Sequence, residues 1–289
     1  MNPKICIVGS ANIDQISYVD TIPSDGETVF GDSYQMGFGG KGANQAVMAG
    51  LLGADVYMIA CLGTDVYNKM TVDNLNNNNV NTDFIQTVNG SSGVAPIWVD
   101  KTGQNRIIVI PGANNLIDAD IAIDSLSNIG PLDVVVGQFE IPLEVNEKVF
   151  EYAKNNGVQT VLNPAPAGDV SEKLLNNTSW FIPNEIEFEE MLGDPFNENA
   201  LLKQAKEVNP EIIVTLGENG CAEVSDGKVY IHQAKKVTAI DTTGAGDAFV
   251  GSFAYGLASK MSKQDSIQLA LEKATNSVTK KGTQSSYRD

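Results

Sequence analysis

The sequence predicts an α/β fold, a three-layer sandwich whose mostly parallel central sheet is flanked by helices, with a small β-sheet lid in addition. Short apolar runs alternate with helical patterns along most of the 289 residues. Repeated strand–helix units of this kind form a parallel sheet covered on both faces. Two segments instead alternate polar and apolar residues, which is typical of hairpins. We expect residues 1–289 to form one domain, because an α/β fold of this size commonly stays single.

The elements of the main layers follow from apolar periodicity and turn residues. Three consecutive valines indicate a buried strand at Val134–Gln138, and Gly157 is suited to end the helix that follows it. The run Asn76–Asn79 is expected to be a helix end and surface loop without a chemical role. The other expected strands are Ile5–Gly9, Val56–Leu62, Val158–Leu162, Trp180–Pro183, Ile212–Leu216, Lys228–His232 and a strand-like run at Lys236–Ile240. The expected helices are Lys41–Leu52, Val66–Leu75, Leu143–Asn156, Gly246–Leu257 and Lys263–Lys280.

The two alternating segments lie at Ile13–Tyr34, around a turn at Pro23–Gly26, and at Val94–Ile110, around a turn at Lys101–Gln104. Each is expected to be a hairpin, and together they can pair into one small sheet at about residues 13–35 and 94–110. Alternation gives this sheet one apolar face, which must be buried against something.

Composition excludes several classes of protein. A net charge of −17 without any Lys/Arg cluster argues against nucleic acid and anionic membranes as partners. No apolar run reaches membrane-spanning length, and the N-terminus lacks a signal-peptide pattern. Cys6, Cys61 and Cys221 lie far apart in apolar runs, which indicates reduced core residues of a cytoplasmic protein. The single histidine, His232, ends an expected strand and is expected to be a partly exposed strand residue.

The segment Asp241–Phe249 (DTTGAGDAF) is the first candidate for chemistry. It lies where an expected strand turns into a helix, so its small residues expose backbone N–H groups at the positive end of the helix dipole. Asp247 stands beside these donors and can accept a proton. An anion cradle with a carboxylate base suits phosphoryl transfer to a hydroxyl. The alternative is an ordinary glycine-rich turn with a capping aspartate.

A second segment, Gly37–Ala46 (GFGGKGANQA), decides between these interpretations. Together the two segments closely resemble the two signatures of the ribokinase-like carbohydrate kinases, the PfkB family. The resemblance covers nearly the whole chain and keeps the family's order. Its further matching segments are Gly9–Asp14, Asn163–Pro166, Pro183–Glu187, Thr215–Gly220 and Lys281–Gln284.

The resemblance implies an ATP-dependent sugar kinase in which Asp247 is the catalytic base for the sugar hydroxyl. The amides of Gly244, Ala245 and Gly246 would then stabilise charge on the transferred phosphoryl group. The positions that match sugar-binding residues of the family gather at one expected sheet edge, where open α/β sheets bind ligands. They are Asn12, Asp14, Gly40, Lys41, Asn44 and Glu140.

The resemblance also implies binding groups for ATP and two metal ions. Asn184, Thr215, Gly217 and Gly220 match nucleotide-binding positions, and Glu187 matches the residue that orders Mg²⁺ through water. Asn184-x-x-Glu187 also fits a helix capping box, and both interpretations can hold together. A monovalent cation, K⁺, would be held mostly by backbone oxygens, including the carbonyl of Lys280. The matching shell is Asp241, Thr243, Ser277, Lys280, Gly282 and Ser286.

The expected substrate is D-ribose, phosphorylated at its 5-hydroxyl, because Glu140 and Asn163–Pro166 match the members of the family that act on it. The alternatives are 2-deoxyribose, a ketose, a sugar acid or a nucleoside, whose base could stack on Tyr18, Phe30, Tyr34 or Phe38. A catalytically silent sugar-binding protein is a further alternative, against which Asp247 and the intact glycines argue. In the family the small sheet is a lid over the sugar and often a dimer interface, so a homodimer is expected.

Overall fold

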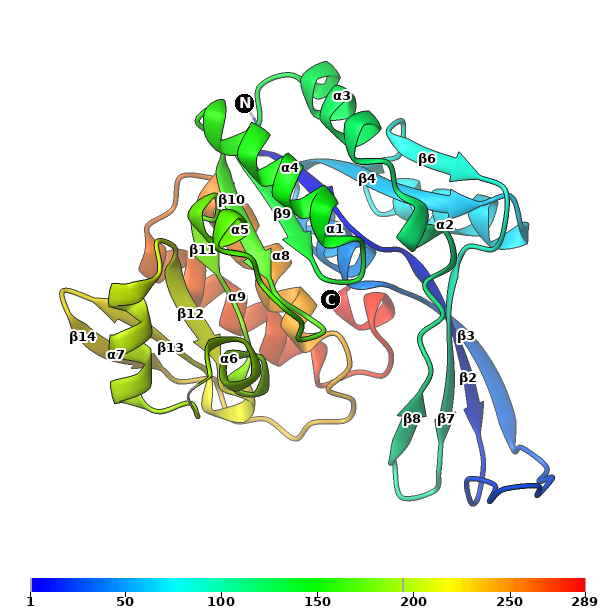
Figure 1. The fold of residues 1–289 in the computed structure, drawn as a ribbon. Helices are drawn as coiled ribbons and strands as arrows, with labels where there is room; N and C mark the ends of the chain where they lie inside the picture. The colour runs from blue at the N-terminus through cyan, green and yellow to red at the C-terminus, as the bar shows by residue number, and fades with distance from the viewer. Residues whose placement is uncertain (1, 194, 289) are drawn as a thin grey trace.

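The computed structural model of the protein describes residues 2–193 and 195–288. Within these residues ten strands form one main sheet (Figure 1), and all its pairings from β12 through β1 to β4, β5 and β6 are parallel. β12, β13 and β14 pair antiparallel at one edge. The order is β14-β13-β12-β11-β10-β9-β1-β4-β5, with β6 beside β4. The strands are β1 (Lys4–Val8), β4 (Asp55–Gly63), β5 (Val80–Asn81), β6 (Ile85–Val88), β9 (Val134–Gln138), β10 (Gln159–Asn163), β11 (Trp180–Phe181), β12 (Glu211–Thr215), β13 (Cys221–Ser225) and β14 (Lys228–His232).

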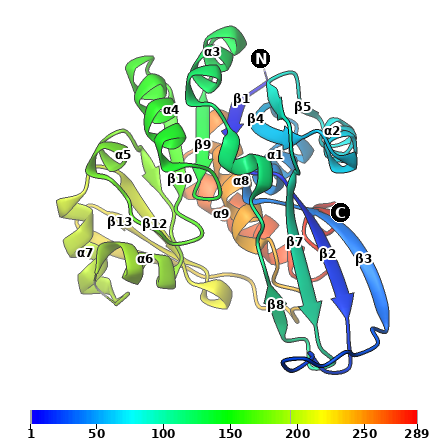
Figure 2. The same cartoon turned by 45° about the vertical axis from the view of Figure 1, so that its right-hand side comes forward.

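Helices cover both faces of this sheet, as Figures 1 and 2 show. Successive residues of β1 belong to different cores: Ile5 and Ile7 pack with α1, α8 and α9, whereas Cys6 and Val8 pack on the side of α3 and α4. This period of two is what a strand buried on both faces produces. The three-layer α/β prediction is therefore confirmed. The helices are α1 (Lys41–Leu51), α2 (Val66–Asn77), α3 (Ala119–Ile129), α4 (Leu143–Asn155), α5 (Glu172–Asn176), α6 (Glu185–Leu192), α7 (Glu198–Glu207), α8 (Ala245–Ala258) and α9 (Lys263–Ser277), with 3₁₀ turns η1 (Gly112–Leu116), η2 (Gly217–Asn219) and η3 (Gln284–Tyr287).

A second, four-stranded sheet projects from the main body (Figure 2). Its order is β3-β2-β7-β8, formed by β2 (Asn12–Tyr18), β3 (Ser33–Gly39), β7 (Gly93–Val99) and β8 (Asn105–Ile107). β2 pairs antiparallel with β3 and parallel with β7, which pairs antiparallel with β8. The prediction that the two alternating segments join in one small sheet is confirmed, and we call this element the small sheet.

Some sequence-based boundaries were wrong. No tight hairpin occurs around Pro23–Gly26; the chain leaves the sheet for residues 19–32 and pairs again only at β3, which runs past Tyr34 to Gly39. Lys236–Ile240 is not a strand. β14 pairs only with β13 at the edge, and the chain then leaves the sheet, so that Val237 and Ile240 lie on the surface. The predictions also missed the helices α3, α5 and α7 and the strands β5, β6 and β13.

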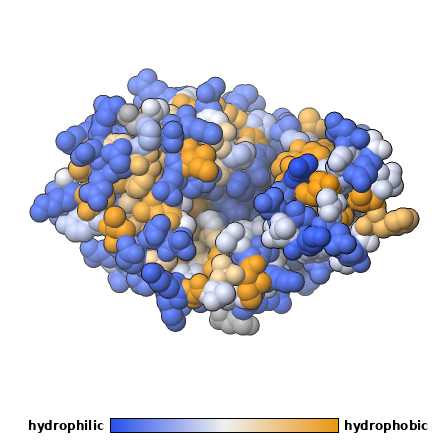
Figure 3. All heavy atoms as spheres, turned by 90° about the horizontal axis from the view of Figure 1, so that it is seen from below, coloured by the Kyte–Doolittle hydropathy of each residue, from blue (hydrophilic) through white to orange (hydrophobic). Residues whose placement is uncertain are grey.

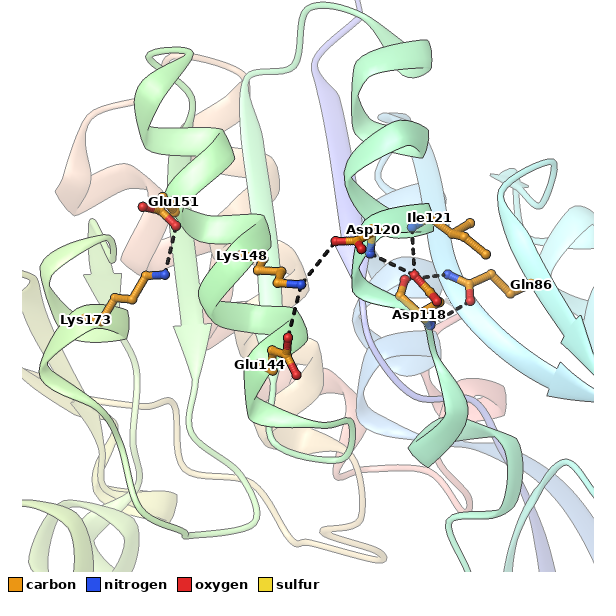
Figure 4. A network of polar contacts seen from close by, with 8 residues as sticks. All are labelled: Gln86, Asp118, Asp120, Ile121, Glu144, Lys148, Glu151 and Lys173. Carbon is orange, nitrogen blue, oxygen red and sulfur yellow. Dashed lines mark hydrogen bonds and ion pairs between the residues drawn. The ribbon is translucent and has the colours of Figure 1, made fainter.

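The helices of one face are joined on their outer surface by ion pairs (Figure 4). Lys148 of α4 reaches Asp120 at the beginning of α3, 3.1 Å away, and Glu144 one turn earlier on α4, also 3.1 Å away. Lys173 of α5 reaches Glu151 of α4 at 2.9 Å. These pairs are solvent-exposed, so each contributes little to stability. No helix in the described part of the chain is long and apolar enough to cross a membrane.

Two substitutions on α4 should separate core packing from surface charge. The side chain of Phe150 is fully buried, so Phe150→Ala should lower the free energy of unfolding by about 3–5 kcal/mol. Lys148→Ala, two residues earlier, should change it by less than about 1 kcal/mol. Urea denaturation followed by circular dichroism measures both. A loss for Lys148→Ala equal to that for Phe150→Ala would contradict this account.

Candidate active site

The parallel strands bring their carboxyl ends to one edge of the main sheet, and polar residues follow five of them. Ser10 follows β1, Glu140 follows β9, Asn163 ends β10, Asn184 follows β11 and Thr215 ends β12. Asn184 and Thr215 are directly paired across the sheet. Ligands of open α/β sheets bind at this edge. Glu140, expected to bind sugar, and Asn184 and Thr215, expected to bind nucleotide, therefore lie at the same edge of the main sheet.

Asp247 lies in the first turn of α8 and is almost fully buried, with 7% of its surface exposed. Asn44 Nδ2 donates to its Oδ2 at 2.8 Å, and Gln45 Nε2 donates to its Oδ1 at 3.0 Å. Burial raises the pKa of Asp247 above its ordinary value, while the charge of Lys41 and the two amide donors act in the opposite direction. The result is a buried carboxylate suited to accept a proton.

Three further charged side chains surround Asp247. Glu140 Oε2 accepts hydrogen bonds from Ser10 Oγ at 2.5 Å and from the backbone N–H of Lys41 at 2.9 Å, which ties β1, β9 and α1 together. Burial alone would lower the pKa of Lys41, but Asp247, Glu140 and Glu187 hold it above its ordinary value. Asp14 has its pKa raised to about 7, first by burial and then by Glu140 and Asp247. The arrangement presents one cation among carboxylates at the sheet edge.

Glycines shape the backbone at both helix starts. Gly40 precedes α1 with φ +87°, and a Cβ there would lie 2.7 Å from Ala11 Cα. Gly244 precedes α8 with φ +77°, a left-handed conformation that favours glycine. A Cβ on Gly246, by contrast, would meet no atom within 4 Å. The start of α8 carries no side-chain cap, so N–H groups of its first turn can bind an anion; that of Ala245 also donates to the carbonyl of Thr242 at 3.3 Å.

Asn184 and Glu187 form a capping box at the start of α6. Glu187 N donates to Asn184 Oδ1 at 2.8 Å, and Asn184 N donates to Glu187 Oε2 at 2.9 Å. The capping interpretation is thus confirmed, and Glu187 Oε1 is not needed for it. Burial raises the pKa of Glu187 above its ordinary value. In the neighbouring loop after Thr215, Gly217 begins η2 with φ +55° and Gly220 follows it with φ +93°.

The residues matched to a cation shell come from two segments that lie together. Asp241 accepts hydrogen bonds from the backbone N–H groups of Thr243, at 3.0 Å, and Gly282, at 2.9 Å. Burial alone would raise the pKa of Asp241, but these hydrogen bonds hold it below its ordinary value. Ser277 and Ser286 are buried, whereas Lys280 is half-buried. Among the described residues, no cluster of three or more His, Cys, Asp or Glu could hold a metal ion.

Asn12 anchors the base of the small sheet. Its Oδ1 accepts a hydrogen bond from Asn114 Nδ2 at 2.7 Å, and a Cβ on Gly93 would lie 2.1 Å from that same oxygen. Asn114 Oδ1 in turn accepts from the N–H of Ala11 at 3.0 Å. The Nδ2 of Asn12 takes no part in these contacts.

A cavity of about 870 Å³ separates the small sheet from the segment that follows α9. Asp14 and Gln35 line it on the small sheet, and Asp241, Thr243 and Gln284 line it on the opposite side. Seen from below, the surface is hollowed between these parts, and the bottom of the hollow is hydrophilic (Figure 3). Asp247 is not part of the lining, but Gln284 Nε2 bonds Asn44 Oδ1 at 2.9 Å and so connects the cavity to Asp247.

Sequence reasoning assigned no role to several residues that the structure brings to Asp247. Gln45 and Gln284 bond the carboxylate or its partner Asn44, and Tyr287 donates to the carbonyl of Gly244 at 2.8 Å. Asn78, inside the asparagine run expected to be surface loop, is 4% exposed and accepts a hydrogen bond from Arg288. Gln45 and Gln284 lie inside segments that match the family motifs, and this position was the one sequence feature that pointed to a role in the site.

The chain belongs to the pfkB family of carbohydrate kinases, whose model matches residues 2–289. It is 37% identical over 292 residues to a ribokinase of Haemophilus influenzae, covering 99% of this chain and 95% of the relative. It is 36% identical over 292 residues to a deoxyribokinase of Salmonella typhimurium, covering 98% and 95%. The structure of Arabidopsis thaliana ribokinase complexed with ribose and ATP is 29% identical with a TM-score of 0.89, covering 99% and 96%.

These findings, with the site geometry, define the class of protein: an ATP-dependent sugar kinase of the ribokinase type. The relatives that match it carry names for two different sugars, ribose and deoxyribose. Family membership therefore determines the reaction class, and the sugar is a separate question.

The raised pKa of Asp14 leads to a prediction about stability. An unfolded aspartate releases its proton near pH 3.9, whereas native Asp14 holds it up to a pH of about 7. Between these values the native state binds more protons, so stability falls as pH rises and stays low above pH 7. Asp14→Asn should therefore raise the melting temperature at pH 8 by at least about 2 °C, and the gain should shrink toward pH 4.

Differential scanning calorimetry across this pH range measures the effect. The exposed Asp25→Asn serves as the control, because it removes a charge outside the site. A gain for Asp14→Asn that is independent of pH would show that Asp14 has the same pKa in the native state as in the unfolded chain.

Proposed function

We propose that this sugar kinase transfers the γ-phosphoryl group of ATP to the 5-hydroxyl of D-ribose, giving ribose 5-phosphate, with Asp247 as general base. The observation that carries the proposal is the buried Asp247 carboxylate at the uncapped start of α8, where Gly246 leaves open space. A proton acceptor and a set of anion-binding N–H groups are then within one helical turn of each other. Phosphoryl transfer to an alcohol needs both.

In this reaction the sugar oxygen forms a bond to the γ-phosphorus while the bond to the leaving ADP oxygen breaks. The hydroxyl proton passes to Asp247. The amides of Gly244, Ala245 and Gly246 stabilise the charge on the transferred group, and the helix dipole acts in the same direction. Asn44 and Gln45 hold the carboxylate in place for this step.

Sugar recognition is assigned to the polar groups between the main sheet and the small sheet. Asp14, Lys41 and Glu140 surround Asp247 with groups that can bond hydroxyls, and Asn44 and the backbone of Gly40 adjoin them. Asn12 adds its side-chain amide. A site built to bond a hydroxyl rejects analogues that lack it, which favours ribose over 2-deoxyribose. The resemblance to a deoxyribokinase keeps 2-deoxyribose as the second candidate.

ATP is expected beside η2, with Thr215, Gly217, Gly220 and Asn184 along its phosphates and ribose. Mg²⁺ fits near Glu187, whose Oε1 is free of the capping interaction and could hold one of the ion's waters. Mg²⁺ keeps several waters and takes few protein ligands. It would neutralise charge on the ATP phosphates.

Asp247→Asn should reduce turnover by about 10²-fold or more while ribose and ATP still bind, because the amide cannot accept the proton. A coupled ADP-release assay measures turnover, and calorimetry measures binding.

In the parent protein ribose should show the highest kcat/KM in a panel with 2-deoxyribose, fructose and a nucleoside. Turnover of Asp247→Asn within a few-fold of the parent would remove Asp247 from the mechanism, and a better substrate than ribose would replace the proposed sugar.

K⁺ is proposed at the junction of the Asp241–Thr243 turn with the segment of Ser277, Lys280, Gly282 and Ser286. The support is that Asp241 already ties these two segments together through Thr243 and Gly282. An ion held by their backbone oxygens would steady the turn that leads into α8. Turnover should therefore rise when K⁺ replaces Na⁺ at matched ionic strength. Equal rates in K⁺, Na⁺ and a large organic cation would contradict the proposal.

The small sheet is proposed to close over the sugar and to pair two subunits. One of its faces carries exposed apolar side chains: Tyr34 and Trp98 both pair with Ser17, and Met36 pairs with Gln15, so all three lie on the same side. Exposed apolar side chains gathered on one face are unfavourable in water, and two-fold pairing is the commonest way to cover them. Closure would also exclude water, which protects ATP from hydrolysis.

Light scattering at micromolar concentration should therefore give the mass of a dimer. Tyr34→Asp should shift it toward the monomer, because a buried unpaired charge opposes association. Ile121→Asp on α3 is the matched control, since the two side chains are 59% and 50% exposed. A monomeric parent with full activity would contradict the dimer.

A further inference from the structure

Two chains of amide hydrogen bonds converge on the carboxylate of Asp247, one at each oxygen. The first reaches Oδ1 from the carboxyl end of β9, and the second reaches Oδ2 from α2 and η3. Almost all of their members are buried uncharged amides, which are rare in cores unless their hydrogen bonds are satisfied.

The first chain begins at Gln138, the last residue of β9. Gln138 Nε2 donates to Gln45 Oε1 at 2.7 Å. Gln45 Nε2 then donates to Asp247 Oδ1 at 3.0 Å and to Asn163 Oδ1 at 3.1 Å. Asn163 Nδ2 donates onward to the carbonyl of Ile182 at 3.0 Å. Gln138 and Gln45 are fully buried.

The second chain begins at a permanent cation. Arg288 donates to Asn78 Oδ1 at 2.9 Å. Asn78 Nδ2 donates to the backbone carbonyl of Asn74 at 2.7 Å and, over 3.3 Å, to Asn74 Oδ1. Asn74 Nδ2 donates to Gln284 Oε1 at 2.7 Å, and Gln284 Nε2 donates to Asn44 Oδ1 at 2.9 Å. Asn44 Nδ2 closes the chain on Asp247 Oδ2 at 2.8 Å.

Apart from the side branch through Asn163, both chains run in one direction: after the first member, each amide accepts from the member before it and donates toward the carboxylate. The direction is self-consistent, because an arginine can only donate and an ionised carboxylate can only accept. Turning one amide over would place two acceptors or two donors against each other. Hydrogen-bond chains of a single direction polarise and strengthen one another.

We propose that Gln45 and Gln284 are positioning residues, which orient the Asp247 carboxylate and keep it ionised by presenting amide donors to it, Gln45 directly and Gln284 through Asn44. The inference rests on the proposed role of Asp247 as base. Stability alone does not account for Gln138, because its Oε1 is buried without a hydrogen-bond partner among the described residues, and such an atom is destabilising. The hydrogen bond from Gln138 Nε2 to Gln45 orients the Gln45 amide toward Asp247, which is a role apart from stability.

The other ionisable groups that act on Asp247 belong to five different elements or loops. They are Lys41 of α1, Asp14 of β2, Glu140 after β9, Glu187 of α6 and Tyr287 of η3. Substitution of Gln45 or Gln284 removes none of them. A change in the titration of Asp247 in such variants therefore reports the loss of the amide donor.

The test compares Gln45→Leu, Gln284→Leu and Gln45→Glu with the parent enzyme and with Gln86→Leu, a glutamine on β6 that bonds Asp118 away from the site (Figure 4). The kcat of ribose phosphorylation is followed from pH 5 to 9. Folding is checked by thermal melting, and ATP affinity by calorimetry.

Loss of a donor to the charged form raises the pKa of the base, so the acidic limb of the profile should move to higher pH. A hydrogen bond to a charged group corresponds to about one to two pKa units, and Gln45→Leu should shift the limb by about that amount. Gln45→Glu should shift it further, because it brings a second carboxylate to Asp247. Plateau kcat should fall roughly 10- to 100-fold through misplacement of the base, with ATP affinity and Gln86→Leu unchanged.

An acidic limb that stays in place in folded Gln45→Leu or Gln284→Leu overturns the proposal, even if kcat falls. Should Gln45→Leu fail to fold, Gln284→Leu decides alone. If Asp247 is not the general base, the result is different, because Asp247→Asn would then keep its turnover. Equal shifts in the control Gln86→Leu would also overturn the assignment.

Discussion

Burial of the Asp247 carboxylate is the constraint on which the rest of the site depends. Removing the group from water favours its protonated form, which cannot act as a base. The charge of Lys41 and the amides of Asn44 and Gln45 oppose that tendency. These partners come from α1, whereas Asp247 belongs to α8, and the two helices pack on the same face of the sheet. The packing of α1 against α8 therefore also sets the ionisation of the base.

Much of the fold was predictable because its signals are local. The valine-rich β9, the period of two in the small sheet and the glycines before α1 and α8 each depend on a few neighbouring residues. The errors occurred where tertiary pairing decides. Lys236–Ile240 has the composition of a strand but no neighbouring strand to pair with, and β3 begins only where the chain returns to β2 after residues 19–32.

In the candidate site, too, the residues in local motifs were predictable and those defined by tertiary contacts were not. Motifs identified five of its members, and the structure brings them together at one sheet edge: Asp14, Lys41, Asn44, Glu140 and Asp247. Gln45 and Gln284 were not named, because a glutamine reveals neither its burial nor the direction of its amide in a sequence. Asn78 was assigned to solvent because asparagine runs are usually exposed, yet Arg288 and Asn74 hold it inside.

The contacts of η3 also bear on how the protein matures. Gln284 bonds Asn44, and Tyr287 bonds the carbonyl of Gly244, so residues made after both motif segments complete the surroundings of the base. On the ribosome, α1 and α8 emerge before these residues do. A nascent chain that has already formed its sheet still lacks the contact that fixes Asn44. Competence for phosphoryl transfer should thus appear only after η3 has been made and has bonded Asn44 and Gly244.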